Sequence, residues 1–103
     1  MNPIIRKDKH YRITVEEVGA EQESLQTRRI EFHDREDLFK IIDNLKHGSG
    51  LEPDTATKLG LALRLLGPEM MRNRKHPLFS DFMPHFKNFM QKLKNTVKEA
   101  MKK

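Results

Sequence analysis

The stretch from Ala56 to Met71, ATKLGLALRLLGPEMM, is the most apolar part of the sequence. At about 3.6 residues per turn, Leu59, Leu63 and Leu66 fall on one face of a helix, and further leucines widen that face on both flanks. A helix of this kind needs cover on more than one side. We therefore expect it to be the central helix of one compact domain, wrapped by its neighbours.

The composition is that of a small folded protein. The 103 residues are 36% hydrophobic and 34% charged, and the apolar residues recur periodically, which is not typical of a disordered chain. One domain spanning residues 1–103 is expected, with mobile ends at 1–8 and 100–103. The absence of cysteine excludes disulfides and thiolate chemistry and is compatible with a cytoplasmic location.

No segment has the pattern of a signal peptide or a membrane span. Arg6, Lys7 and Lys9 lie near the N-terminus, but no apolar run of signal-peptide length follows them. Nowhere do about twenty apolar residues follow one another. The sequence therefore predicts a cytoplasmic protein that does not span a membrane.

Two alternating segments predict a β-hairpin. In residues 9–18, Tyr11, Ile13 and Val15 point to one side and polar residues to the other. The alternation resumes in residues 25–33, and the polar segment 19–24 between them is typical of a hairpin loop. Two antiparallel strands are expected.

A first helix is expected after the hairpin, because the hydrophobic period changes at Asp34. Asp34 is a candidate N-cap, and Gly48 is a typical terminator. Phe39 widens an apolar face made of Leu38, Ile41, Ile42 and Leu45.

Proline shapes the remaining helices. Pro53 suits the first position of the central helix, and Pro68 predicts a kink near Gly67-Pro68, since proline removes one backbone donor and crowds the preceding turn. After a turn at residues 77–80, a last helix capped by Ser80 or Asp81 is expected. Its apolar face contains Phe82, Phe86, Phe89, Met90, Leu93, Val97 and Met101. The expected class is α+β, a hairpin followed by three helices (ββααα).

The excess positive charge lies in the C-terminal half. Residues 1–50 hold nine Lys and Arg against ten Asp and Glu, whereas residues 51–103 hold eleven against five. A basic surface suits acidic partners, nucleic acid among them, although solvated charge explains such runs as well. The aromatic residues that would stack on bases are expected to be buried, except Phe79. The candidate nucleic-acid contacts are Arg72, Arg74, Lys75, Lys87, Lys94 and Lys98.

No catalytic or cofactor signature stands out. The adjacent pair His33-Asp34 and the i, i+4 pair Asp81 and His85 could each orient an imidazole, but neither has a nucleophile or a third group. Residues 48–50, Gly-Ser-Gly, lack the features of a phosphate loop. We assign no catalytic residue, no metal ligand and no cofactor.

Three short motifs resemble a known family. They are KHYRITV at 9–15, LALRLLG at 61–67 and RKHPLF at 74–79. In this order and spacing they are similar to an uncharacterised bacterial family, domain-of-unknown-function family 3861, over about Lys9 to Leu93. The resemblance implies a soluble, single-domain bacterial protein with an α+β fold. It implies no activity, ligand or catalytic residue.

The sequence leaves three functional hypotheses. A hairpin with two open edges is rarely stable alone, which favours a small non-catalytic interaction or accessory protein that acts as a homodimer. Its contacts would use the strand edge or an apolar remainder of the helices, and a further protein partner stays unidentified. The alternative is nucleic-acid binding through the C-terminal basic residues, and an enzyme comes third.

Overall fold

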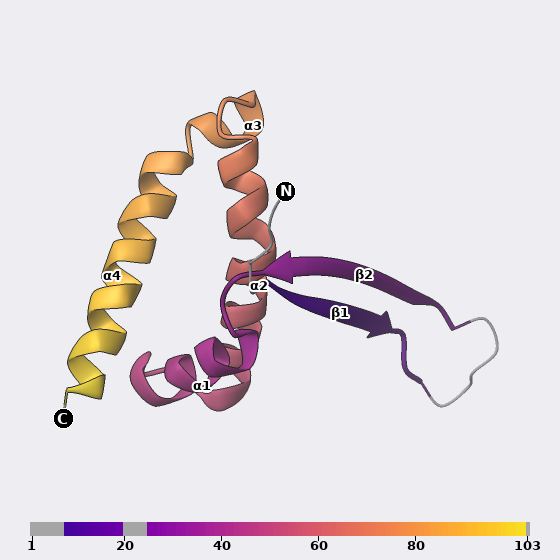
Figure 1. Cartoon of the computed structure of the whole chain (residues 1–103), viewed down its shortest axis with the longest axis horizontal. Coiled ribbons are helices and arrows are strands. Elements are labelled where there is room, and N and C mark those ends of the chain that lie inside the picture. Colours follow the sequence, from indigo (N-terminus) through magenta and orange to yellow (C-terminus); the bar gives the residue numbers. More distant parts are fainter. Residues whose placement is uncertain (1–7, 20–24, 103) are drawn as a thin grey trace. The chain divides into compact units, whose positions relative to one another are not determined.

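The computed structural model describes residues 8–19 and 25–102, and it has an α+β fold. Two compact units divide the chain: Met1–Glu36, which we call the hairpin unit, and Asp37–Lys103, the helical unit. The described part holds one more helix than the three expected (Figure 1). The elements are β1 (Lys9–Glu16), β2 (Thr27–Asp34), α1 (Leu38–Gly48), α2 (Pro53–Arg72), α3 (Pro77–Ser80) and α4 (Met83–Met101).

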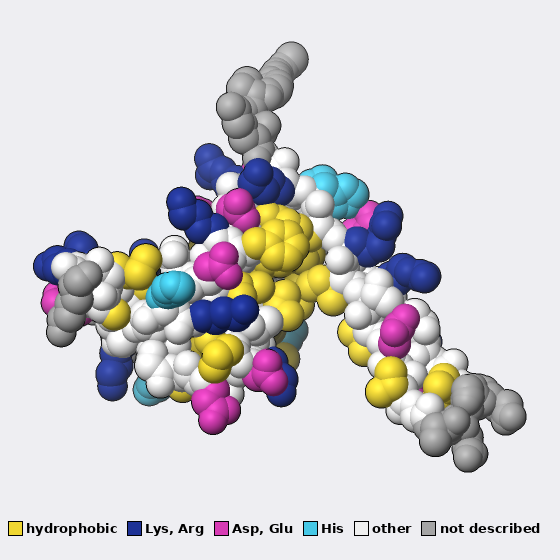
Figure 2. Space-filling view, turned by 90° about the horizontal axis from the view of Figure 1, so that it is seen from below, with side chains coloured by type: hydrophobic (Ala, Val, Ile, Leu, Met, Phe, Trp, Pro, Cys, Tyr) yellow, Lys and Arg dark blue, Asp and Glu magenta, His cyan; other side chains and the backbone are white. Residues whose placement is uncertain are grey.

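The hairpin unit consists of β1 and β2 paired antiparallel, as the alternation predicts. In the register Tyr11 lies opposite Phe32, and Ile13 opposite Ile30, so apolar side chains meet across the pair on one face. Hydrophobic side chains reach the surface of the hairpin at the right of Figure 2. Most of the expected loop, residues 20–24, lies outside the described residues, as do residues 1–7 and 103 of the ends expected to be mobile.

Helix α1 begins later than expected, because Asp37 and not Asp34 caps it. Asp37 Oδ1 accepts the backbone N–H groups of Phe39 (3.1 Å) and Lys40 (3.2 Å), two donors that a helix start leaves unpaired. The Asp34 carboxylate instead accepts the N–H of Glu36 at 3.0 Å, which forms a turn at the end of β2. The prediction of Asp34 as N-cap was therefore wrong by three residues.

Helix α2 begins at Pro53 and continues unbroken through Pro68 to Arg72. Pro53 occupies the first turn, where its missing N–H costs nothing, as expected. The helix is not divided at Pro68, and the kink at that position stays a prediction. None of the described helices has the length and apolar character that crossing a membrane requires.

Two glycines let α1 lie close to its neighbours in the helical unit. A Cβ at Gly60 of α2 would lie 3.1 Å from Ile42 Cγ1 and 3.2 Å from Leu45 Cδ1 of α1. A Cβ at Gly48, the last residue of α1, would lie 3.1 Å from Val97 Cα of α4. Gly48 therefore allows the close approach of α4 to the end of α1. The positive φ angle in the link after α1 is that of Gly50, at 84°.

A second packed region joins the C-terminal end of α2 to the start of α4. Met70, Met83 and Phe86 are buried there, with Leu63, Phe79 and Met90 partly buried around them. Here the chain reverses, so that α2 and α4 run in opposite directions and α3 joins them at one end (Figure 1). Fully burying one such side chain stabilises a fold by about 1.5–3 kcal/mol.

The central helix is not wrapped as its composition predicts. Leu59 and Leu63 are half-buried, and Leu66 is 45% exposed. The physical reason is that α2 is packed closely at two places, against α1 around Gly60 and against α4 around Met70. Leucines that do not point into either place receive only partial cover from the helical unit.

The turn expected at residues 77–80 is the short helix α3. His76 caps it, since His76 Nδ1 accepts the N–H of Leu78 at 3.1 Å. This local cap explains the additional helix. Helix α4 then starts at Met83 without a side-chain cap, so Ser80 and Asp81, which end α3, were wrongly predicted as its cap.

The phenylalanines are less buried than the sequence predicts. Phe86 is buried and Phe79, which was expected to be exposed, is half-buried against the second packed region. By contrast, Phe39, Phe82 and Phe89 are exposed. Helix α4 therefore has more apolar surface than the helical unit covers.

Candidate interaction surfaces

A polar cluster occupies one face of the hairpin unit. His10 lies opposite His33 in the register, and their rings stack with centroids 4.6 Å apart and an interplanar angle of 14°. Arg12 lies opposite Glu31, and Glu31 binds both neighbours: Oε2 lies 3.1 Å from Arg12 Nε and Oε1 lies 2.8 Å from His10 Nε2. The alternation of the strands places all four side chains on the same face.

The cluster keeps its carboxylate ionised. The hydrogen bond from Arg12, that of His10 and the positive charge of Arg12 lower the pKa of Glu31 below its ordinary value. A carboxylate held in this way accepts hydrogen bonds and does not act as a general acid near neutral pH. The side chains of His10, Arg12 and Glu31 are exposed, and they contact one another across the two strands. We therefore interpret the cluster as cross-strand contacts of the hairpin.

The structure gives the surroundings of the two histidine–aspartate pairs noted in the sequence. The His33 ring stacks on His10, while Asp34 bonds to the backbone of Glu36. In the described part of the chain, no hydrogen bond or ion pair joins Asp81 to His85. No group of three or more His, Cys, Asp or Glu residues within 8–19 and 25–102 is placed to hold a metal ion.

The six basic residues proposed for nucleic-acid contact divide into two groups. Arg72 pairs with the carboxylate of Glu69 one turn earlier, and Arg74 Nη1 donates to the carbonyl oxygen of Met71 at 3.0 Å. Lys75 follows in the exposed turn after α2. These three residues are tied to, or lie beside, the C-terminal end of α2.

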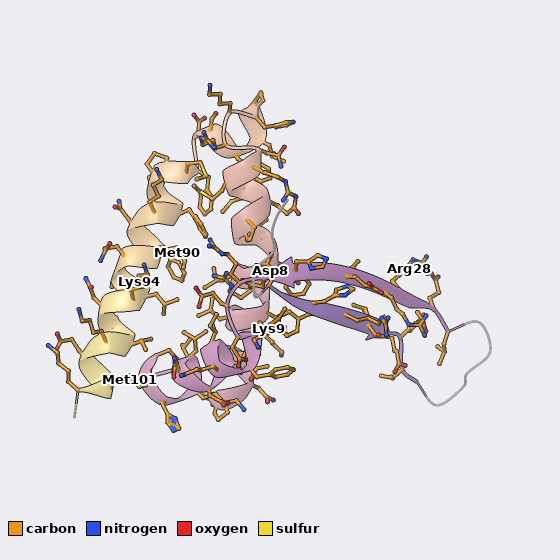
Figure 3. The ribbon with its side chains drawn as sticks, in the orientation of Figure 1. Asp8, Lys9, Arg28, Met90, Lys94 and Met101 are labelled. Carbon is orange, nitrogen blue, oxygen red and sulfur yellow. The ribbon has the colours of Figure 1, made fainter. Side chains whose placement is uncertain are left out.

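Lys87 and Lys94 come together on α4. They lie on the rim of a hollow of about 380 Å³ whose other lining residues are Met71, Phe86, Met90 and Gln91. We call it the methionine hollow. Lys98 lies one turn beyond Lys94 and extends the same stripe along the helix. Met90 and Lys94, one turn apart, are labelled in Figure 3.

A second hollow, also of about 380 Å³, lies on the opposite flank of α4. Its lining is mainly apolar, with Leu51, Leu59, Phe89 and Leu93 beside Ser49, Lys92 and Thr96. Residues seven apart on a helix lie on one face, so Leu66 shares the face of Leu59 on α2, and Phe82, the N-cap of α4, precedes Phe89 by the same interval. We call the surface made of Leu51, Leu59, Leu66, Phe82 and Phe89 the α2–α4 apolar surface; Phe82 is 47% and Phe89 43% exposed.

The sequence predicted that Leu59, Leu66, Phe82 and Phe89 would be buried in the core, so this surface was not expected from it. A usable signal was present in α4. Its apolar residues span a wider arc than one covering helix needs, since Phe82 and Phe89 flank the line of Phe86, Leu93 and Val97. An arc of that width is typical of a helix that contacts more than one neighbour.

Together these features define a small α+β protein with a β-hairpin unit and a helical unit that displays apolar and basic surfaces. The chain belongs to the family DUF3861, described as a domain of unknown function with a solved structure, which it matches over residues 9–95. This confirms the family suggested by the three motifs. No curated protein matches the chain.

A solved structure supports the same assignment. The chain is similar to the crystal structure of a protein of unknown function from Pectobacterium atrosepticum, with 37% sequence identity and a TM-score of 0.74. The similarity covers 84% of this chain and 97% of that one. That protein brings no activity or ligand to the comparison.

Proposed function

We propose that the protein is a non-catalytic interaction or accessory protein that acts as a homodimer through the α2–α4 apolar surface. The observation that carries this proposal is the exposure of large apolar side chains around one hollow of the helical unit. Leu51 and Phe89, which line the hollow, are 41% and 43% exposed, and Leu66 and Phe82 are 45% and 47% exposed. Exposed apolar side chains in this number are typical of a protein–protein interface.

The size of the surface suits a dimer. Helix α2 has 20 residues and α4 has 19, so each is roughly 30 Å long. A helix of about 10 Å diameter and this length offers a face on the order of 300 Å². Standard interfaces bury roughly 800 Å² per partner, so the faces of both helices would have to take part to supply most of such an area.

The charges around the surface allow two copies to meet. Lys92 lines the hollow, and Glu99 lies two turns further along α4 on the same side. On α2, Glu69 lies one turn after Leu66. A two-fold interface places the same patch against itself, and a rim with both signs avoids the repulsion that a single sign would cause.

The test is the mass of the protein in solution. Light scattering after gel filtration should give twice 12.2 kDa at tens of micromolar, roughly the range of weak dimers. Phe89→Glu and Leu66→Glu should each reduce the mass to that of one chain, because a buried unpaired charge opposes association. Leu78→Glu is the matched control, since Leu78 is 73% exposed on α3 and lies outside the surface.

Two results would contradict the proposal. The first is a native protein of monomeric mass at the same concentration. The second is a dimer that survives both helix substitutions but dissociates with Ile30→Glu, which would move the interface to the hairpin unit. Circular dichroism of each variant distinguishes loss of association from loss of folding. A bacterial origin and a cytoplasmic location stay predictions.

A further inference from the structure

The methionine hollow differs in chemistry from the α2–α4 apolar surface on the other flank of α4. Its apolar lining residues, which we call its floor, are Met71, Phe86 and Met90, and its polar lining residues, which we call its rim, are Lys87, Gln91 and Lys94. At about 380 Å³ it falls at the small end of ligand pockets, which span roughly 300–1,000 Å³. Unbranched methionine side chains adjust to the shape of an apolar group that enters.

The rim of this hollow has a single sign. Lys87, Gln91, Lys94 and Lys98 follow at steps of four, three and four residues, so they form one stripe along α4. No acidic side chain interrupts the stripe, and Glu99, the only acidic residue of α4, lies elsewhere and pairs with Lys102 at 3.7 Å. Within the described residues, none of the three lysines of the stripe has an ion-pair partner.

We propose that the methionine hollow and its lysine stripe bind an acidic amphipathic helix of a partner protein. The apolar side chains of such a helix, spaced at i, i+3 and i+4, would enter the hollow, and the flanking carboxylates would lie along Lys87, Lys94 and Lys98. Charge complementarity selects this occupant, because an isolated basic stripe beside an apolar floor requires both features in its partner.

Two other occupants fit less well. A second copy of this chain would bring lysine stripe against lysine stripe, and like charges across an interface cost free energy. Nucleic acid would use the lysines but not the apolar floor, and Phe86, the aromatic residue of the floor, is buried and offers no face for base stacking. The single charge sign of the rim and the apolar floor together therefore favour an acidic amphipathic helix over a second copy of the chain and over nucleic acid.

The experiment is a fluorescence anisotropy titration of the full chain with a labelled probe peptide. The probe is a helix of roughly sixteen residues, long enough to be partly helical alone, with leucines on one face and glutamates on the others. A second probe has the same composition with the leucines dispersed around the helix. Single-stranded RNA and DNA of matched charge are the third and fourth probes.

The variants are matched in charge. We expect Lys87→Glu combined with Lys94→Glu to weaken binding of the first probe at least tenfold, since attraction becomes repulsion. Lys40→Glu combined with Lys46→Glu makes the same change of net charge on α1 and should alter binding less than about twofold. Met71→Asn, which makes the floor polar without a charge, should weaken binding several-fold.

The outcomes separate this proposal from the homodimer. Binding of the first probe that is lost in the Lys87/Lys94 variant and kept in the Lys40/Lys46 variant supports the proposal, whatever the oligomeric state. No binding at low salt, equal loss in both variants, or equal binding of the dispersed probe would overturn it. Tighter binding of RNA or DNA through the same lysines would also overturn it and establish the nucleic-acid alternative.

Discussion

In the helical unit, Met70, Met83 and Phe86 form a packed cluster of buried side chains, whereas in the hairpin unit Ile13 and Ile30 meet across the strand pair. Met70 is 1% exposed and Ile30 51%. The hairpin unit is therefore held by backbone pairing and cross-strand contacts, and the helical unit by close packing. Substitutions of similar size should consequently have very different effects in the two units.

The largest effect is expected from Met70→Ala. Loss of this buried side chain should leave a cavity and lower the free energy of unfolding by about 2–5 kcal/mol. The matched control is Ile30→Ala in β2, which should cost only about 0.2–1 kcal/mol. Urea denaturation followed by circular dichroism measures both. Equal losses would show that the hairpin unit is packed more tightly than its exposure indicates.

A smaller loss is expected from Gly60→Val. The new Cβ would lie 3.1–3.2 Å from Ile42 and Leu45, and its methyl groups would push α1 away from α2. Overpacking of this kind costs about 1–3 kcal/mol. Ala62→Val on the exposed part of the same helix should cost at most about 0.7 kcal/mol, the difference in helix propensity. Indistinguishable melting curves would contradict the close approach of the two helices.

The next effect concerns the start of the helical unit. Asp37→Ala removes the acceptor for two backbone N–H groups of α1 and should lower stability by about 0.5–2 kcal/mol. Asp43→Ala, in the exposed middle of the same helix, removes the same charge without removing a cap and should not destabilise. Chemical denaturation of the pair isolates the cap, and equal stability of the two variants would argue against it.

The smallest effect belongs to the hairpin unit. Arg12→Gln should raise the pKa of Glu31 toward its ordinary value, because Arg12 is the main cause of its lowering. Because the pKa of Glu31 is lower in the folded protein than in the unfolded chain, its ionised carboxylate stabilises the fold at pH values above the unfolded-state pKa. This contribution is lost as the pH falls through the folded-state pKa. An NMR titration of the Glu31 carboxyl measures the change. Arg29→Gln, opposite Thr14 in the register, should leave that pKa unchanged.

Prediction from the sequence was most successful where the signal is local. Alternation located both strands to within a few residues, and the spacing of Leu38, Ile42 and Leu45 located the buried face of α1. It failed where a neighbouring residue offers a competing local bond. Asp37 has the cap that was assigned to Asp34, and His76 caps a short helix in a segment predicted to be a turn.

The candidate sites were predicted only in part. The basic character of α4 followed from the spacing of Lys87, Lys94 and Lys98, but the apolar floor beside them involves Met71 of another helix. Arg72 and Arg74, grouped with those lysines in the sequence, make local bonds at the end of α2. The contacts between helices determine which charged residues share a surface. The spacing of residues along one helix predicts only which of its own side chains lie on the same face.

The amino-acid order alone determined both strands, the three long helices, the α+β class and the family, because hydrophobic period, prolines and short motifs act within a few residues along the chain. Only the tertiary structure decided which apolar side chains are covered. Close approaches at Gly48 and Gly60 and the packing around Met70 fix where the helices touch. Cover depends on those distances, so Leu66 and Phe89, apolar like their buried neighbours, remain at the surface.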